Sequence, residues 1–309
     1  MSSARIASRR QRLAEAVGTI SAAARDRIDR PATPAIAAPF PVHGVARVSV
    51  VAHGTTSRLS DLYQRTPLRI LLPDAPDEPI PLAILLNTAG GLVGGDHLET
   101  AIDVGPRARL VVTSQAAEKV YRSAGPRGLV ENRLAVGAQG WLEWIPQETI
   151  FFNGCRFKRR MTVEVADEAQ ILAGEILVFG RIASGERIER GEIQDTWEIR
   201  RNGRLVWADA LWLADGVAEI LGHPAGFDGA LAYGTLIYVG RDAGAHVDRA
   251  RKILGGDGLG AVTQLGEVML ARWLSPEPDR LRRSFARLWM GLRAAIAGLP
   301  ARLPAIWQV

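Results

Sequence analysis

Four carboxylates lie inside segments that otherwise have the composition of β-strands, and carboxylates can bind metals or transfer protons. They are Glu143, Glu148, Glu175 and Asp209. A carboxylate in a strand usually faces water through the two-residue alternation of side chains. Glu175 differs, because apolar residues flank it at 171–173 and 176–179. A buried carboxylate is costly unless it is paired, hydrated or bound to a metal, so Glu175 indicates an internal polar path.

The other common metal ligands are sparse. The histidines lie at 43, 53, 97, 223 and 246, and no two share a helical turn, so there is no local zinc motif. Asp96 and His97 form the one adjacent carboxylate–imidazole pair, and nickel accepts both ligand types. A solvated turn is the more ordinary explanation of this pair. The single cysteine, Cys155, excludes a disulfide framework and a cysteine-cluster metal site, and this usage predicts a cytoplasmic protein.

Two glycine-rich segments invite a nucleotide-binding interpretation that their sequences do not support. Residues 90–96 lack the Gly-Lys-Ser/Thr ending of a phosphate loop, and Asp96 would place a negative charge beside the phosphates. Residues 255–260 do not match the dinucleotide pattern. Paired glycines more often mark tight turns where backbones approach closely. We therefore expect neither segment to bind a nucleotide.

The elements that must position these residues are mostly strands. From residue 45 to residue 239, short apolar or β-branched runs are bounded by Gly, Pro, Asn or Asp. Apolar and polar residues alternate at 48–50 and again at 141–145, which is typical of strands with one buried face. This part of the chain contains no long helical periodicity. The sequence therefore predicts a mainly β protein.

A weak internal repeat gives more detail. Its copies begin at Val104, Val136 and Val165, which are 32 and then 29 residues apart. In each copy a strand ends, a tight turn follows and an apolar strand begins. Stacked β-coils, each burying a face against the next, would produce this spacing. Hairpin turns of a β-sandwich would also produce it, and the repeat favours stacked coils only slightly.

The C-terminal part changes to helical periodicity. Residues 279–299 place on one stripe Leu281, Phe285, Leu288, Trp289, Leu292, Ala295, Ile296 and Leu299. Ser275-Pro276 supplies a start signal, and Gly298 and Pro300 an end. The arginines of this segment lie off the stripe. We expect the helix to pack on the sheet, and we expect a second, shorter helix at 246–254.

The positive charge is concentrated at the two ends of the chain. The formal net charge is +5, while residues 1–36 alone carry +4 and residues 281–309 carry +5. The body is therefore acidic, so the high pI does not indicate a nucleic-acid surface. Ser8-Arg9-Arg10 resembles a twin-arginine export signal, but Arg12 and Glu15 disfavour it. No apolar run approaches the roughly 18 residues of a membrane span.

Four sequence blocks together suggest a known family. They are NTAGGLVGGD at 87–96, QAAEKVYRS at 115–123, LEWIPQETI at 142–150, and Gly180-Arg181 with Gly185-Glu186. These blocks resemble, in order and in spacing, those of urease accessory protein D, the UreD/UreH family. The resemblance covers roughly residue 42 to the C-terminus, and four blocks are far more specific than any one of them.

The resemblance implies a fold and a role. The fold would be a β-helix-like stack of many short strands with two helices, the longer one C-terminal, over residues 37–309. Residues 1–36 are not part of the family pattern, and from their basic composition we expect a disordered extension. The protein would be a maturation chaperone and not an enzyme. It would act with UreF and the GTPase UreG on the urease apoprotein, and would help to insert nickel through an internal tunnel. Ni²⁺ would be transient, with no tightly bound cofactor.

The resemblance also implies candidate residues for this tunnel. By motif position it places Asp96, Glu175 and Asp209 along the route. It places His97, Glu118 and Lys119 nearby, with Lys119 as a neighbour and not a ligand. Oxygen donors spaced along a wet path would bind a divalent ion weakly enough to let it move on.

Two other functions remain open. The first is an interaction scaffold that holds UreF to urease and has no nickel route. It predicts normal urease activation when the strand carboxylates are neutralised one at a time. The second is a β-rich enzyme that uses Glu148 and Glu175 as an acid–base pair, and it predicts turnover by the protein alone.

Overall fold

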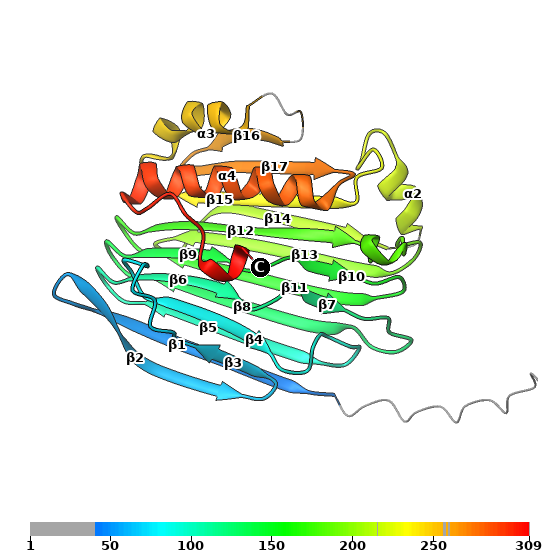
Figure 1. Ribbon diagram of the computed structural model, residues 1–309, viewed down its shortest axis with the longest axis horizontal. Helices are drawn as coiled ribbons and strands as arrows, with labels where there is room; N and C mark the ends of the chain where they lie inside the picture. Colours follow the sequence, from blue (N-terminus) through cyan, green and yellow to red (C-terminus); the bar gives the residue numbers. More distant parts are fainter. Residues whose placement is uncertain (1–40, 215, 256–257, 259, 309) are drawn as a thin grey trace, which may run out of the picture. The chain divides into compact units, whose positions relative to one another are not determined.

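A computed structural model describes residues 41–214, 216–255, 258 and 260–308. The basic extension predicted over residues 1–36 lies outside this part of the chain. The described residues form strands and few helices, as the sequence predicts (Figure 1). Among them, no helix is long and apolar enough to cross a membrane.

Seven strands form a first sheet in the order β14-β13-β11-β8-β5-β1-β2. Their bounds are β1 His43–His53, β2 Thr56–Arg65, β5 His97–Val104, β8 Gly128–Val136, β11 Arg156–Val165, β13 Glu192–Arg201 and β14 Arg204–Leu213. The five inner strands pair in parallel. At the two ends, β2 and β14 pair antiparallel to their neighbours in hairpins, and each hairpin contains a register shift.

Ten strands form a second sheet, whose main order is β16-β17-β15-β12-β9-β6-β4-β3. Their bounds are β3 Leu68–Leu71, β4 Leu82–Asn87, β6 Arg109–Ser114, β7 Glu118–Val120, β9 Trp141–Ile145, β10 Thr149–Phe151, β12 Gln170–Phe179, β15 Ala232–Val239, β16 Gly260–Leu265 and β17 Val268–Ser275. The short strands β7 and β10 pair with each other in parallel, and β10 also pairs with β12.

The predicted repeat corresponds to the coils of a stack. Val104 lies opposite Val136, and Val136 lies opposite Val165, so each copy is one rung of the first sheet. After each valine a tight turn carries the chain into the second sheet, where Leu110 and Leu142 are again neighbours. The strands on either side of each turn therefore belong to different sheets and stack on the next coil. The stacked interpretation is confirmed, and the hairpin interpretation is wrong.

The three turns share a backbone conformation that their residue types do not predict. Arg107, Gln139 and Glu168 occupy the same position in the three coils and have φ angles of 59°, 60° and 56°. None is glycine, although this left-handed region costs about 1–2 kcal/mol for other residues. The stacking offsets part of this cost, because Arg107 N donates to the carbonyl of Ala138 in the next coil, at 2.9 Å.

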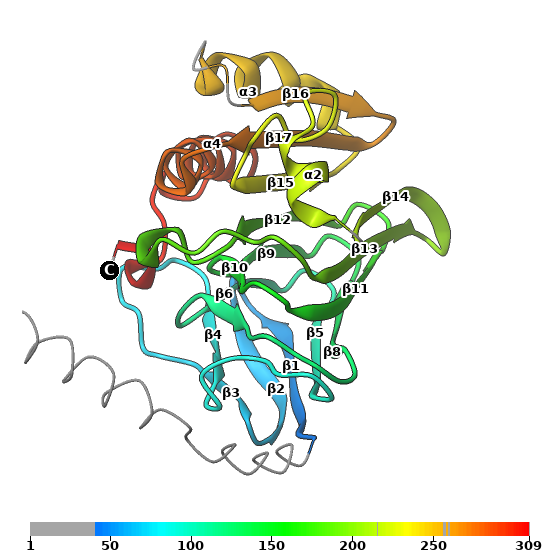
Figure 2. The same cartoon turned by 90° about the vertical axis from the view of Figure 1, so that its right-hand side faces the viewer.

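Apolar side chains fill two cores, one on each face of the second sheet. The first core lies between the two sheets and contains Leu110, Leu142 and Ile171. The second lies between the second sheet and the C-terminal helices and contains Phe285 and Trp289 (Figure 2). Burying a side chain of this size contributes roughly 1.5–3 kcal/mol. The two cores explain why residues 171–179 are apolar on both faces.

The two predicted helices are present, at residues 247–254 and 278–297, and the described residues contain a third. They are α2 Val217–Gly222, α3 Val247–Leu254 and α4 Pro278–Ala297, with 3-10 turns η1 Ile182–Ser184, η2 Ala243–His246 and η3 Ala305–Gln308. The helix α4 is the longest and ends at Gly298, whose φ is 63°. The helix α2 was not predicted, because six residues are too few for a recognisable period.

One part of the α4 prediction is wrong. Its arginines were expected off the buried stripe, but Arg293 is only 1% exposed. Its Nε donates to Glu143 at 3.0 Å, and its Nη1 donates to the carbonyls of Pro300 and Arg302. Arg293 is buried because these acceptors, with the paired Glu78, replace the water that a guanidinium would otherwise need.

Candidate functional site

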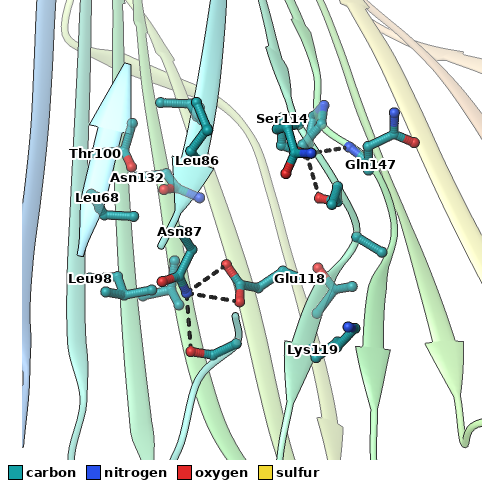
Figure 3. A pocket seen from close by; sticks show the side chains of 18 of the residues that line it. Leu68, Leu86, Asn87, Leu98, Thr100, Ser114, Glu118, Lys119, Asn132 and Gln147 are labelled. Atoms are coloured by element: carbon teal, nitrogen blue, oxygen red, sulfur yellow. Dashed lines mark hydrogen bonds between the residues drawn. The ribbon is translucent and has the colours of Figure 1, made fainter. Parts of the chain in front are cut away.

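An internal cavity of about 320 Å³ lies between the two sheets (Figure 3). Strands of both sheets line it, and so do the segments that follow β4 and β6. Its polar lining residues are Asn87, Thr100, Ser114, Gln115, Glu118, Lys119, Asn132, Gln147, Thr149, Arg159 and Glu175.

Glu118 is one of the two carboxylates that line the cavity. It begins β7, directly after residues 115–117, and Asn87 at the end of β4 faces it. Asn87 Nδ2 donates to Glu118 Oε1 at 3.1 Å, to Glu118 Oε2 at 3.3 Å, and to the carbonyl of Gly91 at 3.1 Å. Burial raises the pKa of Glu118 to about 7, while the hydrogen bond from Asn87 opposes that rise. Glu118 can therefore exchange a proton near neutral pH.

Glu175 lies deeper, in a buried ion-pair network. Its side chain is 4% exposed and pairs with Arg159, which extends from β11. Arg159 also donates to Asp195 of β13, from Nε at 3.0 Å and from Nη2 at 2.6 Å. Trp144 Nε1 donates to Glu175 Oε1 at 3.2 Å. Burial and the charge of Asp195 raise the pKa of Glu175, and Arg159 lowers it less than burial raises it.

Polar groups continue beyond Glu175 towards Asp209. Tyr233 of β15 lies two residues before Thr235, the register partner of Glu175, and interacts with the charges of Asp195, Asp209 and Arg272. The guanidinium of Arg272 lies 5.8 Å from the centre of the Tyr233 ring, and its Nη2 donates to Asp209 Oδ2 at 2.5 Å. Ionisable side chains thus follow one another between the sheets from Glu175 to Asp209.

The structure brings three of the six predicted residues together at the cavity. Glu118, Lys119 and Glu175 line it. Asp209 does not line it and is paired with Arg272. The adjacent Asp96 and His97 point to different places and do not form one site. Asp96 is 4% exposed and is not the solvated turn residue that we expected, because it accepts hydrogen bonds from the backbone N–H groups of Val42 and Val93, both at 3.0 Å.

An outer groove adjoins the cavity. Its lining includes Gln115, Ala116, Ala117, Lys119 and Gln147, which also line the cavity. The opposite wall comes from the C-terminal part, at Arg282 of α4 and at Ile306. Glu148 also lines the groove and pairs with Arg282. Glu148 therefore lines the outer groove and Glu175 lines the cavity, although the enzyme alternative requires the two to act as one acid–base pair.

The C-terminal segment forms part of this wall through specific contacts. Trp307 is buried, and its Nε1 donates at 3.1 Å to Thr113 Oγ1 and to the carbonyl of Ile145. The guanidinium of Arg282 lies 4.2 Å from the centre of the Trp307 ring. The groove wall is therefore held in place by both α4 and the second sheet.

The sequence analysis missed Asn87, Arg159 and Asp195. Strand alternation could have found the last two. In β11 the buried positions are Phe157, Arg159, Met161, Val163 and Val165, and in β13 they include Ile193, Asp195, Trp197 and Ile199. A charged residue in a buried row indicates a paired interior charge as clearly as Glu175 does.

Comparison with known proteins identifies the family. The family model described as UreD urease accessory protein matches residues 42–308. A urease accessory protein UreD of Magnetococcus marinus is 39% identical over 275 residues, which cover 87% of this chain and 94% of that protein. One from a Methylobacterium species is 42% identical over 265 residues, covering 84% and 91%. The chain therefore belongs to the UreD family of urease accessory proteins.

Proposed function

We propose that this accessory protein acts on the urease apoprotein with UreF and the GTPase UreG, and that it helps to insert nickel by letting Ni²⁺ pass between its two sheets. Ni²⁺ is the cargo and not a resident cofactor. The protein is a cytoplasmic chaperone in this proposal and has no catalytic residues. The observation that carries the proposal is that Glu118 and Glu175 line the same internal cavity.

The chemistry of the two carboxylates suits a passing ion. Carboxylates bind divalent cations only in their ionised form, so binding must displace a proton from a group whose pKa is about 7. The buried site makes ionisation costly, and this cost weakens the binding of the ion. A thiolate or imidazole cage would hold the ion more tightly. Oxygen donors with raised pKa values are therefore suited to transfer.

Arg159 determines the charge of the deeper site. With Glu175 and Asp195 ionised, the three side chains carry a net charge of −1. A cation that reaches Glu175 therefore meets an excess negative charge although an arginine is present. Beyond this site, Asp209 forms an ion pair with Arg272, so a carboxylate and a guanidinium again lie side by side.

The proposal is tested by producing urease with and without this chain, together with the other accessory proteins. The nickel content and the specific activity of purified urease are measured, and binding of this chain to apo-urease is measured by co-purification. We expect nickel and activity to fall together when the chain is omitted. Normal urease activation in its absence would refute the accessory role itself.

Single variants test the nickel route separately. We expect Glu175→Ala, Glu175→Gln and Glu118→Gln to lower nickel content and activity while co-purification with apo-urease is unchanged. Glu164→Gln, which removes an exposed carboxylate from the outer face of β11, is the matched control. Full activation by the cavity variants at normal expression would refute the route and would support the scaffold alternative.

A further inference from the structure

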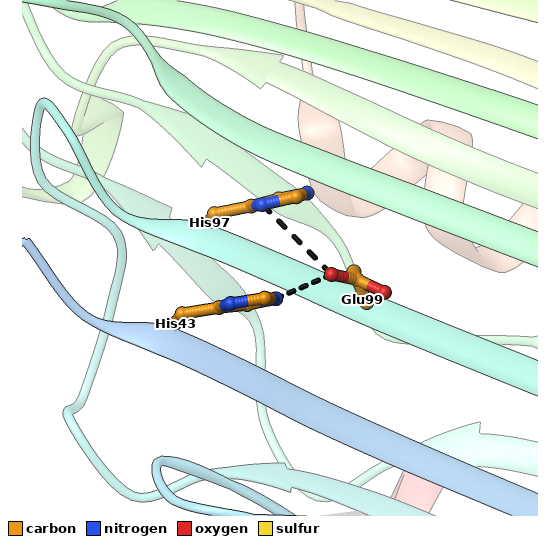
Figure 4. A group of neighbouring side chains, drawn as sticks. All are labelled: His43, His97 and Glu99. Atoms are coloured by element: carbon orange, nitrogen blue, oxygen red, sulfur yellow. Dashed lines mark hydrogen bonds and ion pairs between the residues drawn. The ribbon is translucent and has the colours of Figure 1, made fainter.

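Two histidines and two glutamates come together on the outer face of the first sheet, away from the cavity. His43 of β1 and His97 of β5 are direct neighbours across the parallel pair (Figure 4). Glu99 lies two residues further along β5 and therefore on the same face. Glu131 of β8 is the cross-strand neighbour of Glu99. Three adjacent strands thus place the four side chains, which we call the histidine cluster, side by side.

The donor atoms of the histidine cluster converge on a small volume. His43 Nε2 contacts Glu99 Oε1 directly, and His97 Nδ1 lies 3.9 Å from the same oxygen. One donor atom from each of His43, His97 and Glu99 lies within 4.8 Å of the other two. Metal–ligand bonds of about 2.0–2.2 Å place ligand atoms roughly 3–3.5 Å apart. Small side-chain rotations are therefore enough to bring the three atoms to one ion.

The hydrogen bond made by His97 Nε2 leaves the other ring nitrogen, Nδ1, free to bind a metal ion. His97 Nε2 lies 2.7 Å from Glu131 Oε2, a distance at which the nitrogen carries the proton and the carboxylate accepts it. Nδ1 of the neutral ring then has a free lone pair on the side of Glu99. A carboxylate that orients a metal-binding histidine through its second nitrogen is a common arrangement around protein metal ions.

The histidine cluster is accessible from solvent. The imidazole rings of His43 and His97 are stacked, with centres 4.7 Å apart and planes 7° from parallel. Their side chains are 46% and 29% exposed, so an ion can reach them from solvent. Arg47 lies 3.9 Å from Glu99 Oε2, the oxygen that does not face the histidines, and Arg65 Nε donates to the backbone carbonyl of His43 at 2.7 Å. Neither contact involves an imidazole nitrogen or Glu99 Oε1.

We propose that His43, His97 and Glu99 bind one divalent transition-metal ion, with Glu131 as the positioning residue of His97. Imidazole with carboxylate suits Ni²⁺, Zn²⁺, Co²⁺ or Cu²⁺ and is a poor set for Mg²⁺ or Ca²⁺. This site is distinct from the internal cavity. Thr100 and Asn132 line both the cavity and the hollow beside Glu99 and Glu131 on the outer face, so a single layer of sheet separates the two.

The inference does not depend on the role of the protein in urease maturation, because metal binding is measured directly. Equilibrium dialysis of the full chain against NiCl₂ or ZnCl₂ gives the number of ions bound and their affinity. The double variant His43→Ala/His97→Ala is compared with His53→Ala, which removes an exposed histidine from the far end of the same strand. We expect the double variant to bind one ion fewer per chain, and His53→Ala to bind as the unaltered protein does.

Two further measurements separate ligands from structural effects. We expect Glu131→Gln to weaken binding about 10- to 100-fold while retaining the site, as is usual for a carboxylate that orients a metal-binding histidine. We expect X-ray absorption of the nickel-loaded Glu118→Gln/Glu175→Gln variant to show two imidazole ligands, because that variant leaves the histidine cluster intact. Circular dichroism confirms folding of each variant. Unchanged stoichiometry and affinity in the double histidine variant, or binding only at millimolar metal, would overturn the proposal.

Discussion

The raised pKa of Glu118 makes the stability of the protein depend on pH in a way that one substitution can isolate. The substitution is Glu118→Gln, which keeps the size of the side chain and removes its titration. Because the folded-state pKa of about 7 exceeds the ordinary value of 4.5, the folded chain holds this proton more tightly than the unfolded chain does. The corresponding stabilisation is complete below pH 4.5 and is lost as the pH rises through 7.

The magnitude follows from the two pKa values. At about 1.4 kcal/mol for each pH unit between them, the full difference is about 3 kcal/mol, most of which falls between pH 5 and pH 8. Contact of the side chain with solvent reduces this value, so we expect about 1–3 kcal/mol. The free energy of unfolding of the unaltered protein should decrease by this amount relative to Glu118→Gln over that range. The sign follows because the variant has no proton to lose.

The assay is urea unfolding of the full chain followed by tryptophan fluorescence at several pH values, since eight tryptophans provide the signal. The measured quantity is the difference between the two stability curves, so groups common to both proteins cancel. Glu164→Gln reports the effect of losing one exposed carboxylate. Parallel curves for the unaltered protein and Glu118→Gln would show that burial does not perturb this carboxylate, and the transfer chemistry derived from it would then be wrong.

Two further predictions concern stability. Arg293→Met should destabilise the protein by about 3–5 kcal/mol in urea unfolding, because it leaves the carboxylate of Glu143 buried without its cation. The control Arg283→Met, on the exposed side of the same helix, should cost under about 1 kcal/mol. Equal losses of stability in the two variants would contradict this account. Gly91→Ala should lower the thermal midpoint of unfolding more than Gly90→Ala does. A Cβ at Gly91 would lie 2.3 Å from the Tyr121 ring, whereas a Cβ at Gly90 would meet no atom within 4 Å. A larger effect at Gly90 would refute the packing argument.

Local pattern was sufficient to predict a mainly β protein, whereas the internal repeat favoured stacked coils over hairpins only slightly. Val104, Val136 and Val165 end equivalent strands, and their spacing is the length of one coil. The C-terminal helix was predictable from its apolar period and its glycine end signal. The burial of Arg293 was not, because it depends on Glu143, which lies 150 residues earlier in the chain. The periodicity of apolar residues predicts one helix or strand at a time, whereas a buried ion pair depends on two elements that lie far apart in the sequence.

The candidate site was predictable only in part for the same reason. Glu175 was recognisable because its own neighbours are apolar, and the structure shows it buried and paired. The adjacency of Asp96 and His97 suggested a common site, but Asp96 precedes β5 and its carboxylate accepts from the backbone N–H groups of Val42 and Val93, whereas His97 begins β5. His97 instead meets His43, which is 54 residues away in sequence and adjacent across the sheet. Ligands that converge through strand pairing cannot be read from spacing along the chain.

The end hairpins of the first sheet terminate the stack of parallel coils. A stack of parallel coils has no fixed length, because the last strand at each end presents unpaired backbone N–H and C=O groups to a further strand. Such stacks can polymerise into filaments. Here β2 and β14 run antiparallel to the coils, and the register shifts at Ser49/Val50 and Ile199/Arg200 interrupt the rung pattern. A parallel coil added at either end would have to pair with a strand that runs in the opposite direction. Two hairpins that contribute no residue to the cavity thus end the stack of parallel coils that contains it.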